Sequence, residues 1–442
     1  MSIEPFYGVL YDNKKDLGKL LAPPYDVLTQ RLRDAYLKKH PNNIVHLDLQ
    51  PELPNDDERS NRYTRAKALY SSWLSESILS VLPRKSFYIY TQSYQLDNVQ
   101  FTRIGVVALV GVQSFQDGAI LPHERTFEGP KEDRLKLLSA LQAHLSQVFL
   151  LYKDPNNLVD NLYSGLSDKD PIAFAKDEEN IIHKLYSIDD ASAQDTIKEL
   201  LSSKVLYIAD GHHRLETAYN YSRIMRKKYG DKKGPYDYTL AFLCNMHQPG
   251  LSVMAYNRYL IPPLGSRIRN LLIEHGFNLQ EYPVDRLSSR NGIKDLKVIL
   301  NSLKKEQGFA LALVSQKDNP RVELVTLKKP LFTEIVKGIE NKGFKECVAK
   351  LDVTVVDKYI FDDLLGIEDA KKKDVLMYEK GYISALDELR SGRIDGAILL
   401  APLSPLDVAE VSDENERMPQ KSTYFYPKLL TGLIIYDYER SI

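Results

Sequence analysis

The sequence predicts an α+β protein, in which strands and helices follow one another irregularly. Hydrophobic residues make up 43% and charged residues 27% of the 442 positions, which are ordinary values for a globular chain. Segments with the alternation of strands and segments with helical spacing of apolar residues interleave without the regular order of a doubly wound α/β sheet. The length of the chain favours two or three packed units.

Charge and composition exclude several classes of protein. The chain has 59 Lys+Arg against 60 Asp+Glu, and this balance argues against nucleic acid as the main partner. The longest apolar run, 104–112, is far shorter than the roughly 20 residues that span a bilayer. Cys244 and Cys347 are isolated, and the first residues lack the pattern of a signal peptide. We therefore expect a cytoplasmic protein without a membrane partner.

In the first third of the chain, apolar spacing predicts helices at 31–40 and 59–78. Two segments rich in β-branched and aromatic residues, 86–95 and 101–115, predict a hairpin whose second strand is buried. The next segment, 131–149, is predicted to be a helix because its leucines form one apolar stripe, namely Leu135, Leu138, Leu141 and Leu145.

Residues 155–200 are polar, and we interpret them as a helical or irregular insertion. After them, 205–209 predicts a short strand that is followed by a tight turn and an amphipathic helix, and 238–246 predicts another buried strand. The composition changes after Pro262-Pro263, where we place a domain boundary.

The C-terminal part begins with a helix, a strand and a helix, followed by a hairpin of 309–316 and 321–328. The last hundred residues predict two helices and one strand, at 356–365, 375–391 and 397–403.

The strongest chemical signal is the motif between the strand 205–209 and its helix, Asp210-Gly211-His212-His213-Arg214. The first N–H groups of a helix attract anions, glycine permits a close backbone approach, and His and Arg add donors for phosphate. Thr217, one turn later, adds a hydroxyl. Asp210 is also a candidate ligand for Mg²⁺, which prefers carboxylates and phosphate oxygens. The alternative is that Asp210 is only the helix N-cap.

A second polar motif, 122–134, leaves a strand and enters the leucine-rich helix. At such a strand edge Glu124 or His123 could act as a general base on a hydroxyl, and Lys131 and Arg134 could neutralise phosphate charge. The alternative is a solvated loop whose acidic residues favour the first turn of a helix.

Two further segments are candidates for the wall of a pocket. In 418–428, Lys421, Ser422 and Thr423 cluster ammonium and hydroxyl donors between aromatic residues and prolines, although an aromatic edge strand explains this segment equally well. In 22–27, two prolines present Tyr25 and Asp26, and the alternative is a simple turn.

In combination, these motifs resemble a known fold and family. An H-E loop that enters a helix, together with a strand–DGHHR–helix unit, resembles the ParB/sulfiredoxin-like fold and, more closely, the free L-serine kinases built on it. The similar segments are APPYDV (22–27), PHERTFEGPKEDR (122–134), ADGHHRLETA (209–218), NMHQPGL (245–251) and MPQKSTYFYPK (418–428). They are similar to a large bacterial family, long left as a domain of unknown function, whose members have been assigned as pyrophosphate-dependent L-serine kinases.

The resemblance implies roles for the matching positions. Glu124 is implied as the catalytic base, with His123 beside it, and Asp210 as an active-site residue. The phosphate-binding set combines the implied turn with the candidates above and comprises Gly211, His212, His213, Arg214, Thr217, Lys131 and Arg134. The substrate-binding set comprises Lys421, Ser422, Thr423, Tyr25, Asp26 and Arg258; before Arg258 stands Asn257, where the family commonly has His.

The implied architecture is an N-terminal region, 1–263, that contains a ParB-like catalytic core at about 100–260 with an N-terminal extension and an insertion at about 155–200. A C-terminal α/β domain, 264–442, follows, and its 418–428 segment is expected to close the site.

The implied function is a kinase that transfers a phosphoryl group from pyrophosphate, or from ATP or ADP, to free L-serine, giving O-phospho-L-serine. Mg²⁺ would bridge the phosphate oxygens. Two alternatives remain open at this point: a non-catalytic nucleotide- or phosphate-binding regulatory protein, and an NTP or phosphate-ester hydrolase on the same fold. The sequence does not indicate an oligomeric state.

Overall fold

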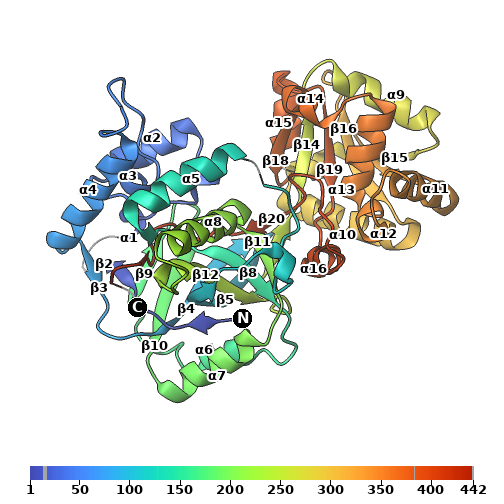
Figure 1. The fold of residues 1–442 in the computed structure, drawn as a ribbon. Coiled ribbons are helices and arrows are strands. Elements are labelled where there is room, and N and C mark those ends of the chain that lie inside the picture. Colours follow the sequence, from blue (N-terminus) through green and yellow to red (C-terminus); the bar gives the residue numbers. More distant parts are fainter. Residues whose placement is uncertain (13–16, 127, 383, 441–442) are drawn as a thin grey trace. The chain divides into compact units, whose positions relative to one another are not determined.

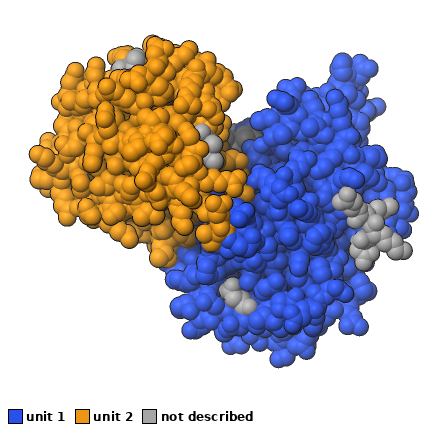
Figure 2. Space-filling model, turned by 180° about the vertical axis from the view of Figure 1, so that it is seen from behind, with its two compact units in different colours: residues 1–96, 100–252, 427–442 blue, residues 97–99, 253–426 orange. Residues whose placement is uncertain are grey.

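The computed structural model describes residues 1–12, 17–126, 128–382 and 384–440. It divides into two compact units, which Figure 1 draws as a ribbon and Figure 2 distinguishes by colour. Unit 1 consists of residues 1–96, 100–252 and 427–442, and unit 2 consists of residues 97–99 and 253–426. The boundary expected after Pro263 lies inside unit 2, and the last residues of the chain belong to unit 1.

A nine-stranded mixed sheet forms the core of unit 1. Its order is β6-β11-β8-β12-β5-β4-β10-β9, and β1 pairs with β5. The pairs β6–β11 and β8–β12 are parallel, whereas β8–β11, β5–β12 and β4–β10 are antiparallel. The strands are β1 (Ile3–Glu4), β4 (Phe87–Leu96), β5 (Val99–Gly111), β6 (Ile120–Leu121), β8 (Val148–Tyr152), β9 (Ala173–Lys176), β10 (Ile182–Ile188), β11 (Leu206–Asp210) and β12 (Tyr238–Asn245).

Helices cover both faces of this sheet, with α5 and α8 on one side and α6 and α7 on the other (Figure 1). The helices of unit 1 are α1 (Leu17–Leu20), α2 (Gln30–Lys39), α3 (Val45–Asp48), α4 (Arg62–Ser75), α5 (Glu128–Leu141), α6 (Leu158–Ser164), α7 (Ala191–Ser202) and α8 (His212–Lys228). Two small sheets pair β2 (Val9–Tyr11) with β3 (Leu79–Val81) and β7 (Ala143–His144) with β21 (Tyr436–Asp437).

The predicted hairpin of β4 and β5 is confirmed, because these strands are neighbours in the sheet. Asp97 and Asn98 connect them with φ angles of +50° and +63°. A two-residue connection with both φ angles positive matches the twist of the strands, and Asp and Asn tolerate that conformation better than most residues.

The predicted helix at 131–149 is wrong in its second half. Helix α5 ends at Leu141, and the next residue, Gln142, has a left-handed φ of +52°. The chain then enters β7, so that Leu145 is buried outside the helix. The apolar spacing continues past Leu141 because Leu138 of the helix and Leu145 of the following segment line the same cavity.

The interpretation of 155–200 as a helical or irregular insertion holds for α6 and α7 but is wrong for the segment between them, which forms two strands of the main sheet. Strand β10 pairs with β4 from Ile182–Ser93 to Ile188–Phe87, and β9 pairs with β10 in turn. The polar composition concealed these strands because buried residues alternate in them with partly exposed ones. Similarly, the segment 375–391, predicted to be one helix, contains β18 (Leu376–Lys380) before α15 (Ser384–Ser391).

Unit 2 is built on a six-stranded sheet of order β15-β17-β16-β19-β14-β18, in which every pairing is antiparallel. Its strands are β14 (Tyr256–Leu260), β15 (Asn278–Tyr282), β16 (Ala310–Ser315), β17 (Arg321–Thr326), β18 (Leu376–Lys380) and β19 (Gly396–Leu400). A separate pair joins β13 (Ser252–Met254) to β20 (Tyr424–Tyr426).

The helices of unit 2 are α9 (Leu264–Glu274), α10 (Arg290–Gln307), α11 (Lys329–Glu340), α12 (Glu346–Ala349), α13 (Asp352–Thr354), a π-helical segment (Val355–Leu364), α14 (Asp369–Val375), α15 (Ser384–Ser391) and α16 (Pro405–Asp413). The predicted order of helix, strand, helix and hairpin after residue 264 is confirmed. Mixed helices and several sheets make the chain α+β, as predicted. Across the ranges that the structure describes, no helix combines the length and the apolar character needed to cross a bilayer.

Candidate functional site

The centre of the candidate site is the junction between β11 and α8. The strand ends at Asp210, Gly211 is the helix N-cap, and α8 begins at His212. Gly211 has a φ of +90°, a conformation that residues with a side chain rarely adopt. The register of β11 against β8 shifts between Ile208 and Asp210, and such shifts re-aim side chains beside functional sites. The predicted strand, glycine turn and helix are therefore present.

Asp210 is held by two cationic side chains and does not cap the helix. Its Oδ2 accepts a hydrogen bond from Nη2 of Arg214 at 2.6 Å, and its Oδ1 accepts one from Nζ of Lys428. Burial by itself raises the pKa of Asp210, but Lys428 and Arg214 outweigh burial and lower the pKa to about 2. The carboxylate is therefore ionised at neutral pH.

Lys428 belongs to the segment 427–442, which we call the C-terminal strap. Nε2 of Gln92 donates to the carbonyl of Lys428 at 2.9 Å, and the guanidinium of Arg103 donates to the carbonyl of Pro427. These bonds hold the strap on β4 and β5 of the main sheet. Sequence reasoning included Lys428 in a motif but not in the site, because no local pattern connects it to Asp210.

The predicted H-E loop lies beside the start of α8. Nδ1 of His123 donates to the carbonyl of Ile208 at 2.7 Å, and the backbone N–H of His123 donates to Nε2 of His212 at 3.4 Å. The two imidazole rings meet edge to face, with their centroids 4.8 Å apart. Oε1 of Glu124 lies 4.0 Å from Nε2 of His123, and the Glu124 side chain is partly exposed. Glu124 is therefore accessible at a loop that is fixed by buried neighbours.

Glu216 ties the same loop to α8. Its Oε1 accepts a hydrogen bond from Nζ of Lys131 at 3.0 Å, and its Oε2 accepts one from Oγ1 of Thr126 at 2.5 Å. Lys131 is therefore paired with a carboxylate. Phe127 lies outside the described residues. Sequence reasoning did not select Glu216, although it lies one turn after His212 on the same face of the helix.

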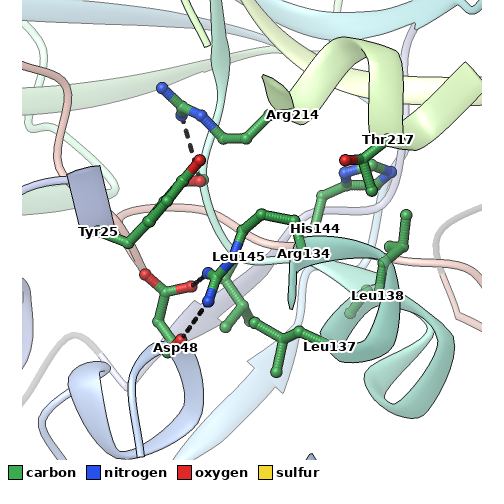
Figure 3. A pocket seen from close by; sticks show the side chains of 11 residues that line it. Tyr25, Asp48, Arg134, Leu137, Leu138, His144, Leu145, Arg214 and Thr217 are labelled. Atoms are coloured by element: carbon green, nitrogen blue, oxygen red, sulfur yellow. Dashed lines mark hydrogen bonds and ion pairs between the residues drawn. The ribbon is translucent and has the colours of Figure 1, made fainter. Parts of the chain in front are cut away.

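A cavity of about 50 Å³ lies beside the junction (Figure 3). Four of the predicted residues line it, namely Tyr25, Arg134, Arg214 and Thr217. The other polar residues on its wall are Asp48, His144 and Ser146, and the apolar ones are Leu137, Leu138, Ala143 and Leu145. Three of the predicted motifs thus come together in unit 1.

Arg134 crosses the floor of this cavity between two carboxylates. Its Nη1 donates to Oδ1 of Asp48 at 2.7 Å, and its Nε donates to Oδ2 of Asp133 at 2.8 Å. Burial lowers the pKa of Arg134, but Asp48 and Asp133 outweigh it and raise the pKa. The guanidinium lies over the ring of Tyr25, 4.3 Å from its centroid. Burial and Asp26 raise the pKa of Tyr25, so this phenol is neutral at physiological pH.

His213 is the partly exposed member of the histidine pair. Burial lowers its pKa, although the carboxylates of Asp26 and Glu216 act in the opposite direction. The imidazole is therefore mainly neutral at pH 7 and offers one donor and one acceptor. This interaction places Asp26 in the electrostatic surroundings of the predicted phosphate-binding turn.

The remaining predicted residues, Lys421, Ser422, Thr423 and Arg258, belong to unit 2. Nζ of Lys421 lies 5.2 Å from the ring centroid of Tyr256, and Nη1 of Arg258 donates to the carbonyl of Tyr256 at 2.5 Å. Ser422 donates its hydroxyl to the carbonyl of Pro419 at 2.5 Å. Lys421 and Arg258 thus lie around Tyr256, which sequence reasoning did not select.

Two places bear on metal binding. Asp357, Asp362 and Asp369 of unit 2 are close enough to share an ion, but Nζ of Lys372 lies 2.7–2.8 Å from an oxygen of each. At the predicted Mg²⁺ ligand, Asp210, both carboxylate oxygens are bound by cations. Neither arrangement fits a directly bound divalent ion, since a cationic side chain already takes the place of the metal.

A family model described as "Protein of unknown function (DUF1015)" matches residues 3–354. Among solved structures, the chain is similar to a free serine kinase in complex with AMP, at 13% identity and a TM-score of 0.34, over 74% of this chain and 92% of that one. It is also similar to a conserved hypothetical protein from Pyrococcus furiosus, at 13% identity and a TM-score of 0.32, over 72% of this chain and 90% of that one.

A third similar structure is C-terminally truncated SbnI from Staphylococcus aureus, at 12% identity and a TM-score of 0.34, over 74% of this chain and 85% of that one. At these TM-scores the likeness carries no functional conclusion. No curated protein matches the chain.

Proposed function

The chain belongs to the DUF1015 family of proteins of unknown function, and we propose that it is a phosphotransferase that converts free L-serine into O-phospho-L-serine. One observation carries this proposal. The H-E loop and the glycine turn, which are distant in the sequence, meet at the start of α8, where His123 contacts His212. A partly exposed carboxylate thus belongs to the same cluster as a helix N-terminus and its cationic neighbours.

The start of α8 is proposed to bind the phosphates. The first N–H groups of a helix lack partners within the helix and carry partial positive charge, so they attract anions. Gly211 has no side chain that could shield them. Lys428 adds an ammonium group and His213 adds a hydrogen-bond donor. Phosphoryl transfer depends mainly on positioning and on charge stabilisation, which such a cluster supplies.

Glu124 is proposed as the general base. Its carboxylate takes the proton from the serine hydroxyl, whose oxygen then forms a bond to the transferred phosphorus. The bond from this phosphorus to the bridging oxygen breaks, and the leaving phosphate departs with the electron pair. His123 is a positioning residue, because its bond to the Ile208 carbonyl fixes the loop that carries Glu124. Pyrophosphate is the proposed donor, and ATP and ADP are the alternatives.

The test is an end-point assay with L-serine, Mg²⁺ and either pyrophosphate, ATP or ADP, in which phosphoserine is detected by mass spectrometry. We expect Glu124→Gln to lower the rate by about 100- to 10,000-fold, because a general base contributes about that much. Binding of pyrophosphate, measured by calorimetry, should be retained. Glu132→Gln is the matched control, since Glu132 is an exposed carboxylate of the same segment and forms a surface ion pair with Lys136.

Each outcome separates the alternatives. Wild-type turnover in Glu124→Gln would exclude Glu124 as the base. Tight binding of a nucleotide without phosphoserine from any donor would favour a regulatory nucleotide-binding protein. Release of phosphate in the absence of serine would favour a hydrolase.

A further inference from the structure

The cavity in Figure 3 has two buried donors on its wall that lack acceptors. Oγ1 of Thr217 and Nε of Arg214 are both inaccessible to water, and neither makes a hydrogen bond within the described parts of the chain. The two residues are three positions apart on α8 and therefore lie on the same face of the helix. Buried donors without acceptors are unfavourable and uncommon in folded proteins. An acceptor bound in the cavity beside Thr217 would satisfy its hydroxyl and would lie next to the charge of Arg214.

The same cavity also has an acidic group on its wall, Asp48; burial raises the pKa of this carboxyl, and the guanidinium of Arg134 acts in the opposite direction. Asp48 faces the cavity next to Arg134, and Tyr25 reaches from the same side toward Arg214 (Figure 3). Burial lowers the pKa of His144 to about 4, so the imidazole on the wall is neutral at pH 7. The charged groups on the wall are therefore two guanidinium groups and one carboxylate. Such a lining suits a ligand that itself carries both signs of charge.

We propose that this cavity binds the head group of a free α-amino acid, with its carboxylate at Thr217 and Arg214 and its ammonium at Asp48. The inference rests on the proposed function, since it places the acceptor of the phosphoryl group. A zwitterion supplies the missing hydrogen-bond acceptor and also a cationic donor for Asp48. A phosphate group would supply acceptors only and would face the Asp48 carboxylate, which is unfavourable.

The size of the cavity agrees with this ligand. A water molecule needs roughly 10–15 Å³ on this scale, so about 50 Å³ holds about four water-sized groups. An ammonium and a carboxylate group fit in that space. The phosphoryl donor is assigned to the start of α8 under the proposed function, so the two substrates occupy different parts of unit 1.

The test measures binding to the full-length protein by calorimetry, without any phosphoryl donor. The ligands are L-serine, L-alanine, which has the same head group but no hydroxyl, and L-serinamide, which lacks the carboxylate. We expect Thr217→Val to raise the Kd of L-serine and L-alanine about 10- to 150-fold, because a hydrogen bond to a charged group is lost. L-Serinamide should bind the wild type more weakly and respond less to the substitution.

Thr239→Val is the matched control. Thr239 is also fully buried with an unpartnered hydroxyl, but it lies in β12 and is not one of the residues that line the cavity. Its substitution should leave the Kd of all ligands unchanged. Thr217→Ser, which keeps the hydroxyl, should bind like the wild type, and Thr217→Ala replaces Thr217→Val if the valine variant does not fold.

An unchanged Kd in Thr217→Val, or no binding of L-serine and L-alanine to the wild type, would overturn the inference. If L-alanine binding depends on Thr217 but no donor yields phosphoserine, the cavity assignment stands and the proposed function fails. If phosphoserine forms and Thr217→Val leaves the KM for serine unchanged, the function stands and the cavity assignment fails.

Discussion

At Asp210, one carboxylate is shared by an arginine of the following helix and a lysine of the C-terminal strap. Removing one partner of a buried ion pair is costly, because the remaining charge is left without compensation. When Lys428 is replaced, Asp210 keeps its hydrogen bond from Arg214, so the loss of stability is partial. This makes Lys428 a suitable position for measuring the strength of the contact.

We predict that Lys428→Met lowers the free energy of unfolding at pH 7 by about 1.5–3 kcal/mol, the range for a hydrogen bond to a charged group. Methionine keeps the length and the apolar part of the side chain. Because the pKa of Asp210 is lowered to about 2 in the folded protein, this stabilisation is present above the unfolded value of about 3.9 and is lost as the pH falls toward 2.

The measurement is chemical denaturation of both proteins between pH 2 and pH 7. The difference in stability should shrink as the pH falls below about 4. Lys198→Met is the control, because Lys198 forms an exposed pair with Glu4, and such pairs contribute little. A difference that is independent of pH would show that Lys428 acts through packing rather than through Asp210.

Single residues were predictable where the pattern is local. The turn at Gly211 and the pair His123–Glu124 stand in short motifs whose residue types point to anion binding and proton transfer. Lys428 was not predicted as a site residue, because it contacts Asp210 across 218 positions. Glu216 was missed for another reason, since a helical glutamate is usually an exposed surface residue.

Among the elements, the β11–α8 junction imposes two separate requirements on Gly211. Its φ of +90° lies where side chains are strained, and a Cβ at this position would lie 3.0 Å from the guanidinium of Arg214. The backbone therefore has to be glycine both for its conformation and for the close approach of the arginine. A second glycine that has a positive φ but no close neighbour separates the contribution of backbone conformation from that of the contact with Arg214.

We predict that Gly211→Ala lowers the free energy of unfolding by about 2–3 kcal/mol and weakens pyrophosphate binding, because conformational strain adds to the clash with Arg214. Gly118→Ala is the matched control, since Gly118 has a φ of +75° but no atom within 4 Å of the added Cβ. Gly118→Ala should lower the free energy of unfolding by about 1 kcal/mol, because only the conformational strain contributes. Equal losses in denaturant unfolding would mean that Arg214 moves aside without cost.

Element types were predictable where the periodicity is undisturbed, as for the β4–β5 hairpin and for β11 with α8. The errors have definite causes. Gln142 ends α5 with a left-handed residue, which apolar spacing does not reveal. Strands β9 and β10 are joined to the sheet by hydrogen bonds to β4, and this pairing compensates for a polar sequence that does not resemble a buried strand.

At the scale of the whole molecule, the C-terminal strap belongs to unit 1, although the residues of unit 2 precede it in the sequence. Tyr436 and Asp437 form β21 against β7, and the hydroxyl of Tyr70 donates to Oδ2 of Asp437 at 2.9 Å. The ring of Tyr436 stacks on His144 at a centroid distance of 5.8 Å. The buried aliphatic residues of the strap are Leu429, Leu430, Leu433, Ile434 and Ile435.

We predict that removal of 427–442 strongly lowers the denaturation midpoint of unit 1, because burial of each large aliphatic side chain stabilises by about 1.5–3 kcal/mol. Trp73, the single tryptophan, is buried in α4 of unit 1, so its fluorescence reports this transition. Tyr436→Phe removes the hydrogen bond to the Pro235 carbonyl and should lower the free energy of unfolding by about 1 kcal/mol. This smaller loss is the reference for the effect of removing the whole strap. An unchanged midpoint in the shortened chain would contradict this role of the strap.

Local sequence patterns predict the α+β class, several of the strands and helices, and the motifs around Glu124 and Gly211. These features depend on residues that are close along the chain, through side-chain periodicity and turn conformation. Only the tertiary structure decided which motifs share a unit. Tyr25, Arg134 and Thr217 line one cavity of unit 1 and Lys428 binds Asp210 in the same unit, whereas Lys421 and Arg258 belong to unit 2. Ion pairs and cavities arise from the packing of distant segments, and neither composition nor periodicity records that packing.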